Sequence, residues 1–172
     1  MRSSTLPTTL SAIIDGVDSK ANANSAFTAI KGTSYSKIST TLAQDLLDSH
    51  TSLDDVIVAS ALSSTAKASL SDFADTFLQL CQTQDDYGVV YDYIVDYEGD
   101  VASLFTGSDK KQILTITSIV RHSQFKRKKP KNYRDLDWEH NVFHLVGAIE
   151  GSSNGTAEAI TTALSLGIYE GQ

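Results

Sequence analysis

Two histidines, His140 and His144, lie four residues apart in the C-terminal third of the chain. On a helix this spacing places both imidazoles on one face, where they could bind the same zinc ion. The zinc-protease motif requires a glutamate directly after the first histidine, but Asn141 stands there. Zinc also needs a third and usually a fourth ligand, for which only His122 or Asp137 are at hand. The pair therefore supports a metal-dependent hydrolase only as the last of three functional hypotheses.

A possible serine nucleophile lies just after this pair. The residues from Gly151 to Gly155 read Gly-Ser-Ser-Asn-Gly, which matches the Gly-x-Ser-x-Gly motif of α/β-hydrolases. That motif needs a strand before the serine and the catalytic histidine later in the chain. Here the preceding residues have a helical pattern, and no histidine follows Ser153. We predict a turn between two helices, with Ser153 or Asn154 as the N-cap of the second, and assign no catalytic residue.

Two glycines, Gly147 and Gly151, continue the stripe that begins with His140 and His144. Glycine inside a helix costs about 1 kcal/mol relative to alanine, so its presence there indicates a packing requirement. The Gly-x-x-x-Gly spacing allows a second helix to approach closely. We expect Gly147 and Gly151 to form a contact surface.

Basic residues are concentrated in one short segment. Seven of the 14 Lys and Arg residues lie between Arg121 and Arg134 with no acidic residue among them, although the net charge of the chain is −7. Residues 126–134 are predicted to form a loop between two helices, because Pro130 disfavours helical backbone before it. The cations of this basic loop are Lys126, Arg127, Lys128, Lys129, Lys131 and Arg134.

This basic loop could bind the phosphates of nucleic acid or anionic lipid, or an acidic protein, or simply be solvated. No base-reading fold or pattern of stacking aromatic residues accompanies it, which argues against sequence-specific recognition of nucleic acid. A nucleic-acid partner is therefore less favoured than a protein partner.

The stretch of residues 85–100 is acidic, rich in tyrosine and free of basic residues. It does not have the ligand order of a calcium-binding EF-hand loop. Packing explains its tyrosines, and an amphipathic partner-binding face is the functional alternative. The acidic residues are Asp85, Asp86, Asp92, Asp96, Glu98 and Asp100, and the tyrosines are Tyr87, Tyr91, Tyr93 and Tyr97.

The same stretch has two apolar patterns. One alternates as in a strand, and a longer one, from Val90 to Phe105, has the period of a helix. We predict a helix, because no second strand candidate exists with which a strand could pair.

Apolar periodicity predicts helices nearly from end to end, and only 2 prolines and 10 glycines interrupt them. We predict an all-α fold, a compact bundle of about eight short helices in a single domain over residues 1–172. The clearest helical face is formed by Leu70, Phe73, Phe77, Leu80 and Cys81. By residue type, the predicted N-caps are Thr5, Ser52, Ser108 and Asp135 or Asp137.

Several protein classes are disfavoured by composition. Cys81 is the only cysteine, so no intrachain disulfide can form, and we expect it to be a small core residue. No apolar run is long enough to span a membrane, and the first residues do not have the pattern of a signal peptide. No motif indicates a cofactor, and the choice between cytoplasm and envelope stays open.

The C-terminal part of the chain resembles a group of short uncharacterised helical proteins from Bacteroidota-type bacteria. The resemblance covers about the last 60 residues and rests on helix-packing patterns of low specificity. The segments that carry it are residues 113–123, 137–139, 146–151 and 159–168. It implies a bacterial source, in which the basic loop could not act as a nuclear localisation signal, and it assigns no activity.

The leading hypothesis is a non-enzymatic helical protein that acts through protein–protein contacts or self-association, in a bacterial cell or its envelope. It follows from the lack of a complete catalytic constellation, from the acidic tyrosine-rich stretch and from the helix with small residues. The alternative is an anion-binding module that uses the basic loop.

Overall fold

The computed structural model describes residues 8–48, 52–84, 86–125 and 134–171. Within these ranges the chain forms nine helices and no strand, which confirms the all-α prediction. The helices are α1 (Leu10–Asn22), α2 (Ser25–Ile30), α3 (Thr40–Asp48), α4 (Leu53–Ala59), α5 (Ser64–Thr83), α6 (Tyr87–Leu104), α7 (Gly107–Phe125), α8 (Arg134–Ser152) and α9 (Thr156–Glu170).

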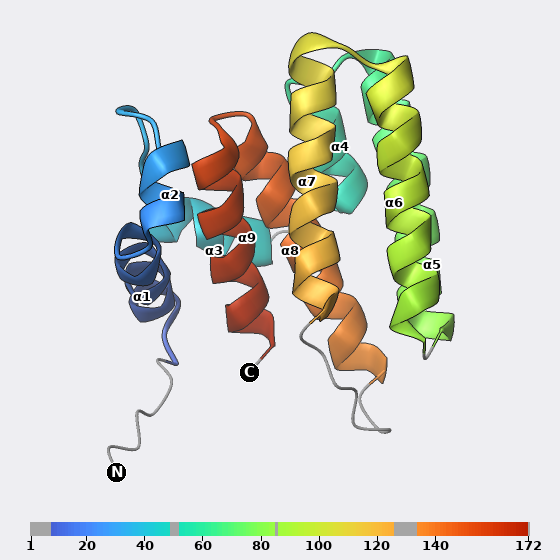
Figure 1. The fold of residues 1–172 in the computed structure, drawn as a ribbon. Helices are drawn as coiled ribbons and strands as arrows, with labels where there is room; N and C mark the ends of the chain where they lie inside the picture. The colour runs from blue at the N-terminus through green and yellow to red at the C-terminus, as the bar shows by residue number, and fades with distance from the viewer. Residues whose placement is uncertain (1–7, 49–51, 85, 126–133, 172) are drawn as a thin grey trace.

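Helices α8 and α9 form a hairpin at the centre of the fold (Figure 1). On one side α1, α2 and α3 pack against α9, and on the other α4, α5 and α7 pack against α8. Helix α6 packs on α5 and α7 at the outer edge of the molecule. Over the described ranges, none of the helices has the length and apolar character needed to cross a bilayer.

The hydrophobic core lies where α5, α7 and α8 meet. The predicted face of α5 is buried except for Leu80, which is partly buried, and Cys81 lies in the core with 6% exposure, as expected. Fully buried core side chains are Leu70, Phe73, Phe77, Ile113, Ile116, Leu145 and Ile149.

The ambiguous stretch is helical, as predicted, and forms α6. Asp86 begins this helix, because its carboxylate accepts a hydrogen bond from the Gly88 amide at 2.8 Å. One face of α6 is buried and contains Val90, Ile94 and Val101. The helical pattern of apolar residues, and not the alternating one, therefore matches the core.

The helix starts were predicted with mixed success. Ser52 caps α4, as predicted, and it does so in a complete capping box with Asp55. The other predicted starts are wrong, since α7 begins at Gly107, one residue before Ser108, and α8 begins at Arg134, before both aspartates. Thr5 lies outside the described residues, and α1 begins at Leu10 with Thr9 as its N-cap. Many serines and aspartates could cap a helix, and packing decides which one does.

A hydroxyl network links α1 to α9. Tyr35 precedes α3 in the chain and donates its hydroxyl proton to Asp18 Oδ1 at 2.8 Å. The same hydroxyl lies 3.4 Å from Thr161 Oγ1 on α9. These contacts position the N-terminal helices on one flank of the hairpin.

Because of this environment, stability should fall as the pH rises above about 10. Burial, and secondarily the hydrogen bond to Asp18, raise the pKa of Tyr35 to about 12. Between the unfolded and the folded pKa, the unfolded chain has lost the proton that the folded protein keeps, so the free energy of unfolding decreases. The Tyr35→Phe variant should show a shallower decrease in urea unfolding between pH 9 and 12. An unchanged slope would contradict this role for Tyr35.

Candidate functional site

The glycine stripe on α8 is occupied by α9 of the same chain. A Cβ atom on Gly147 would lie 2.6 Å from the Cα atom of Ala163, and one on Gly151 would lie 2.6 Å from the Cα atom of Ala159. The two helices therefore meet backbone to backbone, which confirms the predicted close packing. Since both glycines are buried by this contact, they offer no surface to a second protein, and the predicted contact surface is corrected to an internal interface.

The two histidines belong to the same interface. His140 donates from Nδ1 to the carbonyl oxygen of Gly167 at 2.8 Å. His144 is 3% exposed, and its ring lies edge-on to that of His140 with the centroids 4.3 Å apart. A Cβ atom on Gly167 would lie 2.3 Å from His144 Nε2, so the imidazole fits only because that residue is glycine.

In the described part of the chain, no group of three or more His, Cys, Asp or Glu side chains is placed to hold a metal ion. His122 instead lies on α7, where its Nδ1 is 2.7 Å from the carbonyl oxygen of Ser118. The histidine pair thus packs α8 against α9. Among the described residues, no third metal ligand joins the pair to support the hydrolase hypothesis.

The Gly-x-Ser-x-Gly segment is a turn between helices, as predicted. The carbonyl oxygen of Gly151 accepts hydrogen bonds from the amides of Asn154 and Gly155 at 3.0 and 3.1 Å. Gly155, and neither Ser153 nor Asn154, is the N-cap of α9, and it provides no side-chain hydrogen bond. This segment therefore does not form the strained strand-to-helix turn that carries the nucleophile in a hydrolase.

Most of the predicted basic loop, residues 126–133, lies outside the described residues. Arg134 is the first residue of α8 rather than part of a loop. The predicted anion-binding role of Lys126, Arg127, Lys128, Lys129, Lys131 and Arg134 therefore stays a prediction.

The tyrosines and acids of α6 divide into an inner and an outer set. On the inner side Phe73 stacks against Tyr93 and Tyr97, with centroids 5.6 and 4.4 Å away. Burial raises the pKa of Tyr97. At the α7 side Glu98 pairs with Arg121 at 3.4 Å. These residues attach α6 to the bundle.

The outer set is exposed to solvent and is here called the α6 outer face. It consists of Tyr91, Asp92, Val95, Asp96 and Asp100. The three aspartates recur one helical turn apart, and Tyr91 and Val95 beside them keep 38% and 37% of their surface exposed. The Arg121 guanidinium lies 5.8 Å from the centroid of the Tyr91 ring, which places this apolar edge beside α7.

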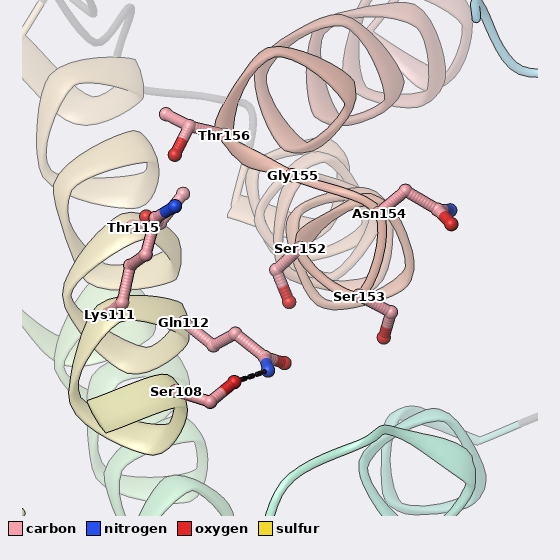
Figure 2. A pocket seen from close by; sticks show the side chains of 9 residues that line it. All are labelled: Ser108, Lys111, Gln112, Thr115, Ser152, Ser153, Asn154, Gly155 and Thr156. Atoms are coloured by element: carbon pink, nitrogen blue, oxygen red, sulfur yellow. Dashed lines mark hydrogen bonds between the residues drawn. The ribbon is translucent and has the colours of Figure 1, made fainter. Parts of the chain in front are cut away.

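A second surface feature is a cleft of about 180 Å³ between α7 and the α8–α9 turn (Figure 2). Helix α7 contributes Ser108, Lys111, Gln112 and Thr115 to its wall, and residues 152–156 form the opposite side. Sequence reasoning missed this cleft. The available signal was Gln112, a polar residue one turn before the core residue Ile116.

Comparison with protein families, with curated proteins and with solved structures finds no match to this chain.

Proposed function

We propose that the protein is a non-enzymatic helical module that acts through protein contacts, and that its α6 outer face binds a basic amphipathic segment of a partner protein. The observation that carries the proposal is the row of three exposed carboxylates beside an exposed Tyr–Val pair on a firmly attached helix.

The aspartates of the α6 outer face form no ion pair with any described residue. In the described residues the ion pairs are Lys37–Asp15 and Arg121–Glu98, so Asp92, Asp96 and Asp100 take part in none. Like charges one turn apart destabilise an isolated helix by about 0.2–0.5 kcal/mol per pair. A partner that brings lysines or arginines to this row would relieve that repulsion.

The apolar edge of the face provides the second half of the interaction. Tyr91 and Val95 lie one turn apart, and tyrosine is enriched at protein interfaces because it combines a large apolar ring with a polar hydroxyl. Val89, with 42% exposure, lies at the first turn of α6 in line with the aspartates, three residues before Asp92. An amphipathic helix with apolar residues flanked by lysines matches both parts of the face.

The face is also preorganised. Tyr93 and Tyr97 anchor α6 on Phe73, and Val101 is fully buried, so little order has to be gained when a partner binds. The negative charge disfavours nucleic acid and anionic lipid as partners of this face. It also disfavours a symmetric dimer through α6, because the aspartates of two copies would face each other.

The test is a fluorescence anisotropy titration with a labelled amphipathic helical peptide made of lysine and leucine, at low ionic strength. The Asp92→Asn/Asp96→Asn variant should bind it about tenfold more weakly, since removing charges from a complementary interface weakens binding by about this factor. Added salt should also weaken the binding of the peptide to the parent protein, because it screens the charges.

The matched control is Asp45→Asn/Asp48→Asn, which removes two exposed aspartates from α3 and changes the net charge equally. It should bind the peptide within about twofold of the parent. Equal losses in both variants would show only non-specific attraction to an acidic protein and would contradict the proposal. Peptide-induced amide shifts should likewise map to α6 and not to α3.

A further inference from the structure

We infer that the cleft between α7 and the α8–α9 turn binds the phosphate group of a small, hydroxyl-bearing phosphate ester. The site is separate from the α6 outer face, because its walls are α7 and residues 152–156. Four features support the inference: the start of α9, the buried amide of Gln112, the ammonium of Lys111 and the composition of the wall.

The N-terminus of α9 supplies backbone donors. Gly155 is the N-cap and has no side chain with which to satisfy the helix, and the first intrahelical bond runs from the Ala159 amide to the Gly155 carbonyl at 3.0 Å. The amides of Thr156, Ala157 and Glu158 precede that bond and have no side-chain cap. Together with the positive end of the helix dipole, such amides favour an oxyanion.

Gln112 is a second, independent sign of a ligand. It is only 9% exposed, and its Oε1 atom has no hydrogen-bond partner among the described residues. Its Nε2 atom donates to Ser108 Oγ at 2.8 Å, and the amide end points from α7 toward the turn (Figure 2). Because a buried polar group without a partner costs stability, a polar ligand or water is expected beside it.

The amide of Gln112 can serve a hydroxylated phosphate in either orientation. As placed, Oε1 can accept a hydrogen bond from a ligand hydroxyl. If the amide turns over, Ser108 donates its hydroxyl proton to Oε1 instead, and Nε2 is directed toward a phosphate oxygen. A ligand with both an oxyanion and a hydroxyl group therefore satisfies this residue in both states.

The charges around the cleft favour an anion. Lys111 forms no ion pair in the described part of the chain and lies in the wall opposite the start of α9. The neighbouring Asp109 is engaged elsewhere, since its carboxylate accepts hydrogen bonds from the Ser63 amide and hydroxyl at 3.1 and 2.6 Å. The acids nearest the turn, Glu150 and Glu158, line a neighbouring cleft that also contains Lys37 and shares Asn154 with this one. The carboxylate of Glu158 lies against the backbone of Gly155, between the two clefts.

The wall limits the size and kind of ligand. None of the nine residues that line the cleft is aromatic, so a nucleobase would have no ring on which to stack. Hydroxyl and amide side chains predominate, and the volume is about 180 Å³. This composition fits a small ester such as a polyol phosphate better than a nucleotide.

The turn that carries the α9 amides is fixed in advance. Gly155 has φ +153°, a backbone conformation that residues with a side chain avoid, and a Cβ atom there would lie 2.9 Å from Glu158 Oε2. The Gly151 carbonyl holds the turn by accepting two amides. Binding would therefore not require the turn to reorganise.

The test is a two-dimensional NMR titration of the ¹⁵N-labelled protein with inorganic phosphate, glycerol 3-phosphate and glycerol. We expect saturable shifts of the Thr156, Ala157 and Glu158 amides and of the Gln112 side-chain amide, with tighter binding of glycerol 3-phosphate than of phosphate and none of glycerol. Absence of phosphate-dependent shifts at these amides overturns the site. Equal affinities for the two anions overturn the assignment to a hydroxylated ester.

Two variants separate the site from general charge effects. Lys111→Met should weaken binding of glycerol 3-phosphate about tenfold or more, because one charge-assisted hydrogen bond is lost. Lys110→Met is the matched control, since the Lys110 ammonium donates to the Ala102 carbonyl at 2.7 Å, away from the cleft. Equal losses in the two variants overturn the inference.

Gln112→Met is expected to change ligand binding and protein stability in opposite directions. It should weaken binding while raising the stability of the ligand-free protein, because an unsatisfied buried acceptor is replaced by an apolar group of similar size. Unchanged affinity in this variant overturns the assignment of Gln112 to the site.

Discussion

Replacing Gly147 or Gly151 with alanine is expected to lower the free energy of unfolding by about 2 kcal/mol in each case. Alanine is the better helix former by about 1 kcal/mol, so helix propensity alone predicts the opposite sign. The added methyl group would lie 2.6 Å from the Cα atom of Ala163 or Ala159. Backbone cannot rotate aside as a flexible side chain can, so α9 as a whole has to move away from α8. Urea unfolding followed by circular dichroism measures the change.

The control is Gly99→Ala on α6, where an added Cβ atom has nothing within 4 Å. This variant should be more stable than the parent by about 0.5–1 kcal/mol, since only the propensity term acts. Gly16→Ala on α1 is a second control of the same kind. If the α8 variants were stabilised like these two, the close approach of α8 and α9 would be refuted.

The glycines show how far the sequence predicts this structure. Their one-turn spacing on a helix indicated a close contact, because glycine is costly in a helix unless a neighbour requires it. The spacing did not identify the neighbour. Ala159, Ala163 and Gly167 on α9 complete the contact, and small residues in an apolar helix also occur without any such role.

Some helix boundaries are set by tertiary packing, which a local sequence pattern does not reveal. The capping box at Ser52 was predictable, because two residues at fixed spacing satisfy each other. The start of α9 at Gly155 was not, because glycine provides no capping side chain and Ser153 and Asn154 are the better caps by residue type. At that position the close packing of Gly151 on Ala159 fixes the turn, and the helix start follows from it.

The candidate surfaces were predictable to different degrees. Local sequence contained the acidic tyrosine-rich stretch, and the helical period separates its outer aspartates from the inner tyrosines. The cleft brings Lys111 and Gln112 together with residues about 40 positions later in the chain, and no local pattern predicts such a meeting. The one signal of the cleft in the sequence is Gln112, a polar residue one turn before the core residue Ile116.

Phe73→Ala is expected to lower the free energy of unfolding by about 3–5 kcal/mol, the usual cost of removing a buried aromatic side chain. Phe73 is 1% exposed and stacks against Phe77, Tyr93 and Tyr97 with centroids 5.8, 5.6 and 4.4 Å away. Urea unfolding of this variant should be compared with that of Val58→Ala. Val58 is 69% exposed, so its truncation should change stability by no more than about 0.5 kcal/mol.

The same substitution links the core to the proposed function. Phe73 is buried, and it stacks against the two tyrosines that attach α6 to α5. The milder variant Phe73→Leu, which should remain folded, is therefore expected to weaken binding of the lysine–leucine peptide by loosening α6, with every charge of the face retained. It should leave the phosphate-induced shifts at Thr156 unchanged, because the cleft is built from α7 and the α8–α9 turn. A loss of both binding activities would mean that the substitution disrupts the whole bundle, whereas retention of full peptide affinity would show that the face does not depend on the rigidity of α6.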